Sequence, residues 1–179
     1  MDEDFIVENI LMAKKKKKIN TGRKGKRRER EVAKILNERF GGGFSRTIGS
    51  GNRTKQVTFL PKHAQDTFSG DLVTPENFVF SIESKGGYDD VDLMSVFDGG
   101  HAQIDEFLEQ AQFDADGCKK KPMVVWKKSR KPLVAMIKTV DIPHENWEYR
   151  LFYKDWSMVS FDELLKVDNS FWFKSDSHS

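Results

Sequence analysis

The stretch Phe78-Val79-Phe80-Ser81-Ile82-Glu83-Ser84-Lys85 combines a strand pattern with a charged end. Large apolar side chains alternate along it, so a strand would point Phe78, Phe80 and Ile82 to one face and Ser81, Glu83 and Lys85 to the other. Asp71-Leu72-Val73 precedes it across a turn at residues 74–77, and we therefore expect a hairpin whose second strand is half-buried. The polar face of that strand would carry an acid and a lysine two residues apart.

Helical periodicity flanks this hairpin on both sides. Val32, Ile35, Leu36 and Phe40 recur at helical spacing, which predicts a helix from Gly22 that ends at Gly41–Gly43. Residues 104–115 repeat the pattern in a helix that Gly117 would end. Further strands are predicted at 44–48, 123–127, 133–138, 149–153 and 156–159, and a short helix from Ser160 with Glu163 placed for a capping box. Together these elements predict an α/β fold.

The charge of the chain is unevenly distributed. Residues 1–40 hold 13 Lys/Arg against 7 Asp/Glu, a net charge of +6, whereas the rest hold 17 against 21, a net charge of −4. A basic segment of this kind favours contact with polyanions, and nucleic acid is the leading partner. For 179 residues we expect one domain. Its parts are a flexible basic arm at residues 1–20, a catalytic core at 21–140, and a small β/α extension at 141–179.

Several classes of protein are disfavoured by the composition. Cys118 is the only cysteine, so an intramolecular disulfide or a cysteine-based zinc site lacks its residues. No apolar run approaches the roughly 20 residues of a membrane span, and Asp2, Glu3 and Asp4 stand where a signal peptide would be basic. We expect a protein of the cytoplasm that does not enter membranes.

Asp71 and Glu83 are the candidate ligands of a metal ion. A hairpin would bring their carboxylates together, and converging carboxylate oxygens suit Mg²⁺, with Mn²⁺ as a substitute. We expect the backbone carbonyl of Ser84 to join them. Lys85, the basic residue of the only acid-x-Lys triplet in the chain, could orient an attacking water and offset charge on a phosphoryl group. The alternative is a surface salt bridge between Glu83 and Lys85.

Short motifs around these residues occur in a consistent order. They are Gly25-Lys26-Arg27-Arg28-Glu29-Arg30-Glu31, Arg46-Thr47-Ile48-Gly49-Ser50-Gly51, Gly70-Asp71-Leu72-Val73, Ile82-Glu83-Ser84-Lys85, Glu109-Gln110-Ala111 and Pro122-Met123-Val124-Val125-Trp126-Lys127. In this order and spacing, residues 22–138 resemble the PD-(D/E)xK nucleases, especially the Holliday junction resolvases of archaea and phages. The resemblance implies a restriction-endonuclease-like fold, with a mixed β-sheet core flanked by helices, and a Mg²⁺-dependent endodeoxyribonuclease. The loop before Gly70 and the tail after Lys138 depart from the family pattern.

The resemblance also assigns roles to residues outside the central strand. A glutamate on the first helix approaches the metal in that family, which implies Glu29, with Glu31 as the second choice. A helix glutamine near the site implies Gln110, for which Gln103 competes. A basic residue on the following strand implies Lys127.

Basic and hydroxyl side chains of the first helix and the glycine-rich loop are candidate DNA contacts. Arg46 and Ser50 could bind phosphates of the cut strand, although a merely flexible surface loop is an equal alternative. The full set of expected DNA-binding residues is Lys24, Lys26, Arg27, Arg28, Arg46, Ser50, Arg53, Gln110 and Lys127.

The leading hypothesis is a structure-selective endonuclease that cuts four-way junctions or other branched double-stranded DNA. A repair or restriction-type nuclease on the same fold is the first alternative, and a non-catalytic nucleic-acid-binding protein is the second. Paired cuts in a four-way junction favour a symmetric homodimer. Apolar residues available for its interface, or alternatively for the core, are Phe152, Trp156, Phe171, Trp172 and Phe173.

Overall fold

A computed structural model of the protein describes residues 21–47, 70–91, 94, 100–144 and 147–175. The expected basic arm at residues 1–20 and two of the expected DNA contacts, Ser50 and Arg53, lie outside this range. Within α2 (Thr21–Phe40), side chains are described from Gly25 onward, so the side chain of Lys24 also lies outside it.

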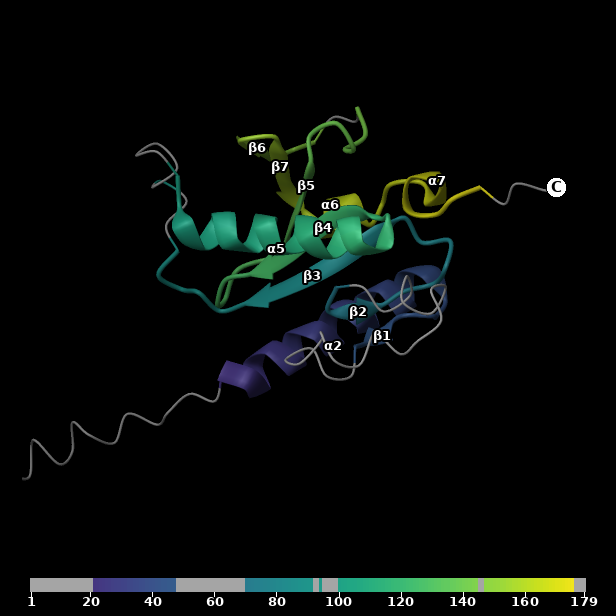
Figure 1. Ribbon diagram of the computed structural model, residues 1–179, viewed down its shortest axis with the longest axis horizontal. Coiled ribbons are helices and arrows are strands. Elements are labelled where there is room, and N and C mark those ends of the chain that lie inside the picture. The colour runs from purple at the N-terminus through teal and green to yellow at the C-terminus, as the bar shows by residue number, and fades with distance from the viewer. Residues whose placement is uncertain (1–20, 48–69, 92–93, 95–99, 145–146, 176–179) are drawn as a thin grey trace, which may run out of the picture.

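Five strands form one mixed sheet in the order β3-β4-β5-β7-β6 (Figure 1). β3 (Phe80–Gly86) and β4 (Lys121–Lys127) run parallel, and the other neighbouring pairs are antiparallel. The remaining strands are β5 (Val134–Lys138), β6 (Arg150–Tyr153) and β7 (Trp156–Ser160). α5 (Ala102–Cys118) connects β3 to β4, because parallel strands need a crossover of about this length. It continues one residue past Gly117, and Lys119 closes it at a φ of +57°.

The expected hairpin is wrong. β1 (Ser45–Arg46) and β2 (Leu72–Val73) pair with each other in an antiparallel two-stranded sheet. Gly70, just before β2, forms a parallel bridge with Ile82 of β3 instead. A tight turn joins only antiparallel strands, so a hairpin cannot place this segment parallel to β3. The segment around Gly70 lies instead along the free edge of β3, between β3 and β1.

β3 is also more buried than the alternating pattern predicted. Its residues 80–84 are buried on both faces, because helices cover the sheet on both sides. Val32 and Leu36 of α2 pack in one core cluster with Phe80 and Ile82. The other cluster joins α5 to the opposite face of the sheet through Ile104, Phe107, Leu108, Val124, Met136 and Met158. The sequence pattern predicted a solvent-exposed face with Ser81, Glu83 and Lys85. In the structure the crossover helix α5 covers that face.

The segment after residue 140 shares the sheet and the core with the rest of the chain. β7 pairs with β5 along five residues, and α6 (Phe161–Leu164) begins at Ser160, whose hydroxyl accepts from the Glu163 amide. A further short helix, α7 (Asn169–Trp172), was not predicted from the sequence. Its Trp172 is fully buried and stacks on Phe78 with ring centroids 5.9 Å apart.

Candidate active site

The candidate site lies along the free edge of β3, where the β2 segment approaches. Gly70 has a φ of +73°, and a Cβ atom there would lie 2.5 Å from the carbonyl oxygen of Ile82. Only glycine allows this approach. The next residue, Asp71, donates its amide to that same Ile82 carbonyl at 2.9 Å. A glycine with positive φ thus delivers the first candidate carboxylate to the strand edge.

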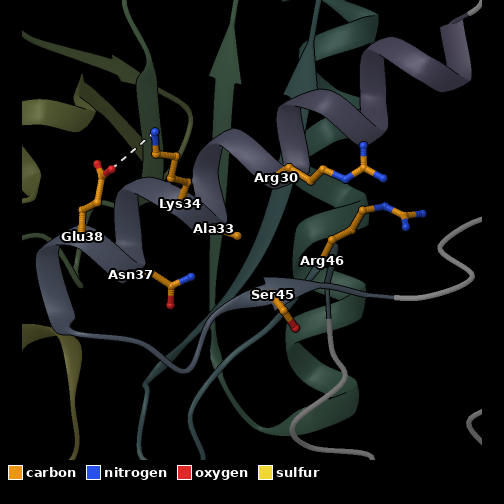
Figure 2. A pocket seen from close by; sticks show the side chains of 7 residues that line it. All are labelled: Arg30, Ala33, Lys34, Asn37, Glu38, Ser45 and Arg46. Atoms are coloured by element: carbon orange, nitrogen blue, oxygen red, sulfur yellow. Dashed lines mark ion pairs between the residues drawn. The ribbon is translucent and has the colours of Figure 1, made fainter.

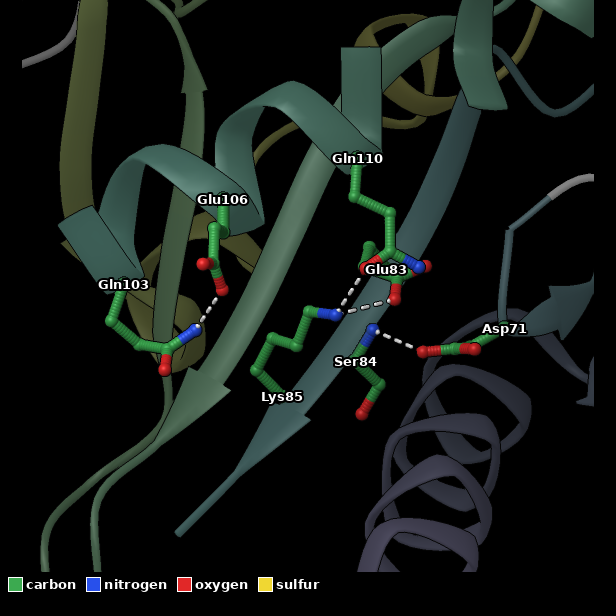
Figure 3. Close-up of polar contacts among 7 residues, drawn as sticks. All are labelled: Asp71, Glu83, Ser84, Lys85, Gln103, Glu106 and Gln110. Carbon is green, nitrogen blue, oxygen red and sulfur yellow. Dashed lines mark hydrogen bonds and ion pairs between the residues drawn. The ribbon is translucent and has the colours of Figure 1, made fainter. Parts of the chain in front are cut away.

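The carboxylate of Asp71 is held against the backbone of β3. Its Oδ2 accepts from the Ser84 amide at 3.0 Å, as Figure 3 shows. The N–H and C=O of one strand residue point to the same side, so the Ser84 carbonyl also lies on this edge. Asp71 and Glu83 are 7% and 2% exposed. The structure therefore brings Asp71 to the main chain of Ser84, the residue next to Glu83, by an edge-on approach in place of the expected hairpin.

Lys85 and Gln110 complete a polar cluster on the α5 face of β3. The Lys85 ammonium donates to Glu83 Oε1 at 2.8 Å and to Gln110 Oε1 at 2.6 Å. It also lies 5.3 Å from the centre of the Phe107 ring, within range of a cation–π contact. Gln103, the competing glutamine, instead donates to Glu106 nearer the start of α5 (Figure 3). Of the two glutamines, only Gln110 contacts the cluster.

The two glutamates of α2 have separate partners. Glu29 is 7% exposed and accepts from Arg46 of β1 at 2.5 Å. Arg46 lies opposite Leu72 in the β1–β2 ladder, so this ion pair lies beside the strand that begins after Asp71. Glu31 instead accepts from Lys127 at 2.9 Å and pairs with Arg28.

The charges around Glu31 affect its ionisation. Burial acts to raise the pKa of Glu31, but the hydrogen bond from Lys127 and the charges of Arg28 and Arg27 outweigh it and lower the pKa. Lys127 lies opposite Gly86 in the β3–β4 ladder, on the α2 face of the sheet. It is therefore on the other face from Lys85.

The exposed side of α2 is rich in basic groups. Lys26, Arg27 and Arg30 are exposed. Figure 2 shows Arg30 of α2 and Arg46 of β1 at one end of a shallow hollow of about 550 Å³ between the two elements. Lys34, which also lines the hollow, pairs with Glu38 at 3.6 Å. The expected basic face exists. Arg46 contributes to this surface and also donates to Glu29.

The residues present fit a magnesium ion. Within the described ranges, no three side chains of the His, Cys, Asp and Glu types are arranged to hold a metal. Mg²⁺ does not require such a cage, because it is usually held by one or two carboxylates while keeping waters and binding substrate phosphates. Asp71, Glu83 and the Ser84 carbonyl form a donor set of this kind, made of oxygens alone.

A mixed sheet between helices, with an Asp and an acid-x-Lys strand meeting at one edge, is the arrangement of a PD-(D/E)xK nuclease. A sequence model of the family described as phage putative PDDEXK endonuclease matches residues 20–171. Since the match spans most of the chain, the protein belongs to this family, and the restriction-endonuclease-like fold and the nuclease class are confirmed. No curated protein and no solved structure gave a match. None of the described helices is long and apolar enough to cross a membrane.

Proposed function

We propose that this nuclease is a Mg²⁺-dependent, structure-selective endonuclease that cuts four-way junctions or related branched DNA. The observation that carries the catalytic part is the hydrogen bond between Asp71 and the main chain of Ser84, the residue next to Glu83, with Lys85 held between Glu83 and Gln110. The branched substrate is supported by the resemblance of residues 22–138 to junction resolvases. In a phage-infected cell this DNA would be in the host cytoplasm.

Asp71, Glu83 and the Ser84 carbonyl would hold the metal, and Glu29 is the candidate for a further ligand through its position beside β2. When bound, Mg²⁺ would supply Lewis-acid stabilisation of the phosphoryl oxygens and an activated water. Lys85 would place its ammonium on the attacking water or a phosphoryl oxygen. The hydrogen bond from Lys85 to Gln110 fixes the direction of the ammonium, so the group needs little reorganisation when a phosphate arrives.

DNA binding would involve the basic side of α2, with Lys24, Lys26, Arg27 and Arg28, together with Arg46 and Lys127. The arm at residues 1–20 and the loop residues Ser50 and Arg53 would add phosphate contacts. Such contacts set affinity and register, and they carry no sequence information by themselves. This is consistent with a nuclease that recognises the shape of its DNA.

The test compares cleavage of a four-way junction, a flap and a linear duplex of matched sequence, with Mg²⁺, with Mn²⁺ and with chelator. We expect metal-dependent cuts in the junction and slower or no cutting of the duplex. Equal cutting of all three would assign the enzyme to the repair or restriction type. Binding without cutting in any metal would leave only a nucleic-acid-binding protein.

A symmetric homodimer would give two equivalent metal sites for the two cuts of a junction. Of the five aromatic residues that the sequence offered for an interface, Trp156 and Trp172 are buried within the chain, and Phe171 and Phe173 pack against its core. Phe152 is 64% exposed on the edge strand β6, beside Leu151 at 56%. An exposed apolar edge strand of this kind is suited to pairing with a second copy.

Mixed dimers test this proposal. Heterodimers of the wild type and Asp71→Asn should nick one strand of a junction and release few resolved duplexes. Phe152→Lys should shift the protein toward monomer in light scattering, while Phe113→Lys, at another exposed phenylalanine (78% exposed) on α5, should not. A monomer that makes paired cuts on a bound junction would contradict the dimer.

A further inference from the structure

A small pocket lies just beyond the candidate active site, where β3 ends. It measures about 130 Å³ and is lined by Arg27, Arg28, Gly86, Gly87 and Ser129. Gly86 and Gly87 directly follow Lys85 in the chain. Figure 1 shows the N-terminal half of α2 passing this end of β3. Three elements therefore meet here: a basic helix, the end of the strand that carries Lys85, and the turn after β4.

Gly86 allows the arginine of α2 to approach the strand. A Cβ atom at Gly86 would lie 3.1 Å from Arg28 Nε and 3.3 Å from Arg28 Cβ and Cγ. Even a methyl group would therefore press on the Arg28 side chain. On the other wall, the amide and hydroxyl of Ser129 donate to the Asp89 carboxylate at 2.8 and 2.7 Å. These bonds fix the turn against the segment that follows β3.

Two buried polar atoms near this pocket have no hydrogen-bond partner within the described part of the chain. They are Arg28 Nε and Ser84 Oγ. Ser84 lies two residues before Gly86 and shares its face of β3, so both atoms lie on the α2 side of the strand end. Buried polar groups are nearly always satisfied in folded proteins. The unsatisfied Arg28 Nε–H and Ser84 hydroxyl therefore indicate that an oxygen-rich ligand or a water molecule binds here.

The charge around the pocket is positive, because Arg27, Arg28 and Lys127 outnumber the nearby acids Glu31 and Asp89. Glu31 is shared by Arg28 and Lys127, and Asp89 accepts from Ser129. Arg27 is exposed, and no ion pair of its side chain is observed among the described residues. Arginine at such a site favours anions with several oxygens, because its planar donors match the geometry of a phosphate.

We propose that this pocket binds a DNA backbone phosphate next to the one that is cut. The inference rests on the proposed nuclease function and adds a second, non-reacting phosphate site to it. Gly87 lies two residues past Lys85, roughly 7 Å along an extended strand, and phosphates of one DNA strand are about 3.4 Å apart along the helix axis. The bound phosphate is therefore within about two nucleotides of the scissile one.

Its role is to set the register of the cut strand. A phosphate held by Arg27 and Arg28 would fix the neighbouring phosphate at the free edge of β3, beside Asp71 and the Ser84 main chain, since both sites lie at one end of the same strand. This contact would act on binding and on cut position, and it would not take part in the reaction.

The experiment pairs a DNA modification with a protein variant. Junctions with one neutral methylphosphonate at each position along a strand through the branch point, including those around the mapped cut, would be bound by the full-length Asp71→Asn protein, which removes cleavage from the measurement. We expect one position within two nucleotides of the cut to weaken binding by about tenfold, the size of a charge-assisted contact. In the Asp71→Asn protein that also carries Arg27→Ala and Arg28→Ala, that penalty should disappear.

Two further variants of the Asp71→Asn protein separate the pocket from general charge. Arg30→Ala removes an exposed arginine of the same helix that lines the hollow by β1, and it should keep the position-specific penalty. Gly86→Ala keeps every charge but crowds Arg28, and it should reduce the penalty. A penalty that is the same in all variants, or spread evenly over all phosphates, would overturn the proposal.

The outcomes also distinguish this site from the catalytic proposal. If the pocket variants leave the position-specific penalty unchanged while the wild type cleaves normally, only the phosphate pocket is ruled out. If the pocket variants abolish the penalty but the wild type cuts no DNA, the catalytic proposal is ruled out and the phosphate pocket is supported.

Discussion

Two carboxylate–lysine pairs lie at the end of the β3–β4 ladder, with nearly the same geometry and different surroundings. Lys85 donates to Glu83 at 2.8 Å, and Lys127 donates to Glu31 at 2.9 Å. The Glu83 and Lys85 side chains are 2% and 14% exposed, whereas those of Glu31 and Lys127 are 31% and 28% exposed. The first pair lies on the α5 face of the sheet, and the second lies on the opposite face, where α2 itself supplies Glu31.

Burial gives these pairs different consequences. A buried charge is costly unless it is compensated, so a carboxylate kept at 2% exposure needs its lysine or a cation. A half-exposed pair is screened by water and contributes little to stability. The contrast favours chemistry at the Glu83–Lys85 pair and electrostatic organisation of arginine and lysine at the Glu31–Lys127 pair.

The largest expected effect comes from the buried carboxylates. Asp71→Asn and Glu83→Gln should each lower the cleavage rate by roughly 10³-fold or more, because they remove metal-binding charge while keeping the side-chain shape. DNA affinity should stay nearly unchanged, since the basic side of α2 is intact. Gel-based cleavage and binding assays measure both, with Glu109→Gln, an exposed acid of α5, as the control. Wild-type rates in Asp71→Asn would remove this site assignment.

A smaller effect is expected from the side chains that orient the buried pair. Lys85→Ala should lower the cleavage rate by about 10²-fold to 10³-fold, through lost charge stabilisation. Gln110→Ala should lower it by about 10-fold to 100-fold, in the range of groups that orient a metal site. Gln103→Ala is the matched control, since Gln103 bonds to Glu106 away from the cluster. Equal losses in the two glutamine variants would mean that the contact to Lys85 has no role in the reaction.

The sequence alone predicted the fold class, the main helices and the strands of the sheet, because these depend on periodicity within one segment. It placed Glu83 and Lys85 on one face of β3 for the same reason. It failed for the approach of Asp71, since pairing of the β2 segment depends on contacts between distant segments. Gly70, with its φ of +73°, was the local signal for that approach.

The α2 glutamates illustrate a second limit. Glu29 and Glu31 are two positions apart on a helix and therefore point to different sides. The sequence could not show that Arg46 would pair with the first and Lys127 with the second. Both partners lie on other elements, and their positions depend on how the helix docks on the sheet. The sequence did not predict the burial of β3 on both faces for a similar reason. The helix α5 that covers one face comes later in the chain, and its docking on β3 is a contact between distant segments.

The smallest effect is expected at the half-exposed pair, where Glu31→Gln tests the pH dependence of stability. The pKa of Glu31 is lowered in the folded protein, because the hydrogen bond from Lys127 and the charge of Arg28 outweigh burial. A group with a lowered folded pKa stabilises the protein above its unfolded pKa, near 4.3, and this contribution is lost as the pH falls through the folded pKa.

Urea unfolding at pH 7 should therefore show a loss of at most about 1 kcal/mol in Glu31→Gln. The difference between wild type and variant should shrink as the pH falls below about 4. Cleavage should change far less than in Glu83→Gln, since Glu31 belongs to α2 and pairs with Lys127 and Arg28 on the other face of the sheet from Lys85. A difference in stability that stays constant down to acid pH would show that packing, and not ionisation, accounts for the role of Glu31. A loss of cleavage as large as that of Glu83→Gln would instead show that the two pairs form one catalytic unit across the sheet.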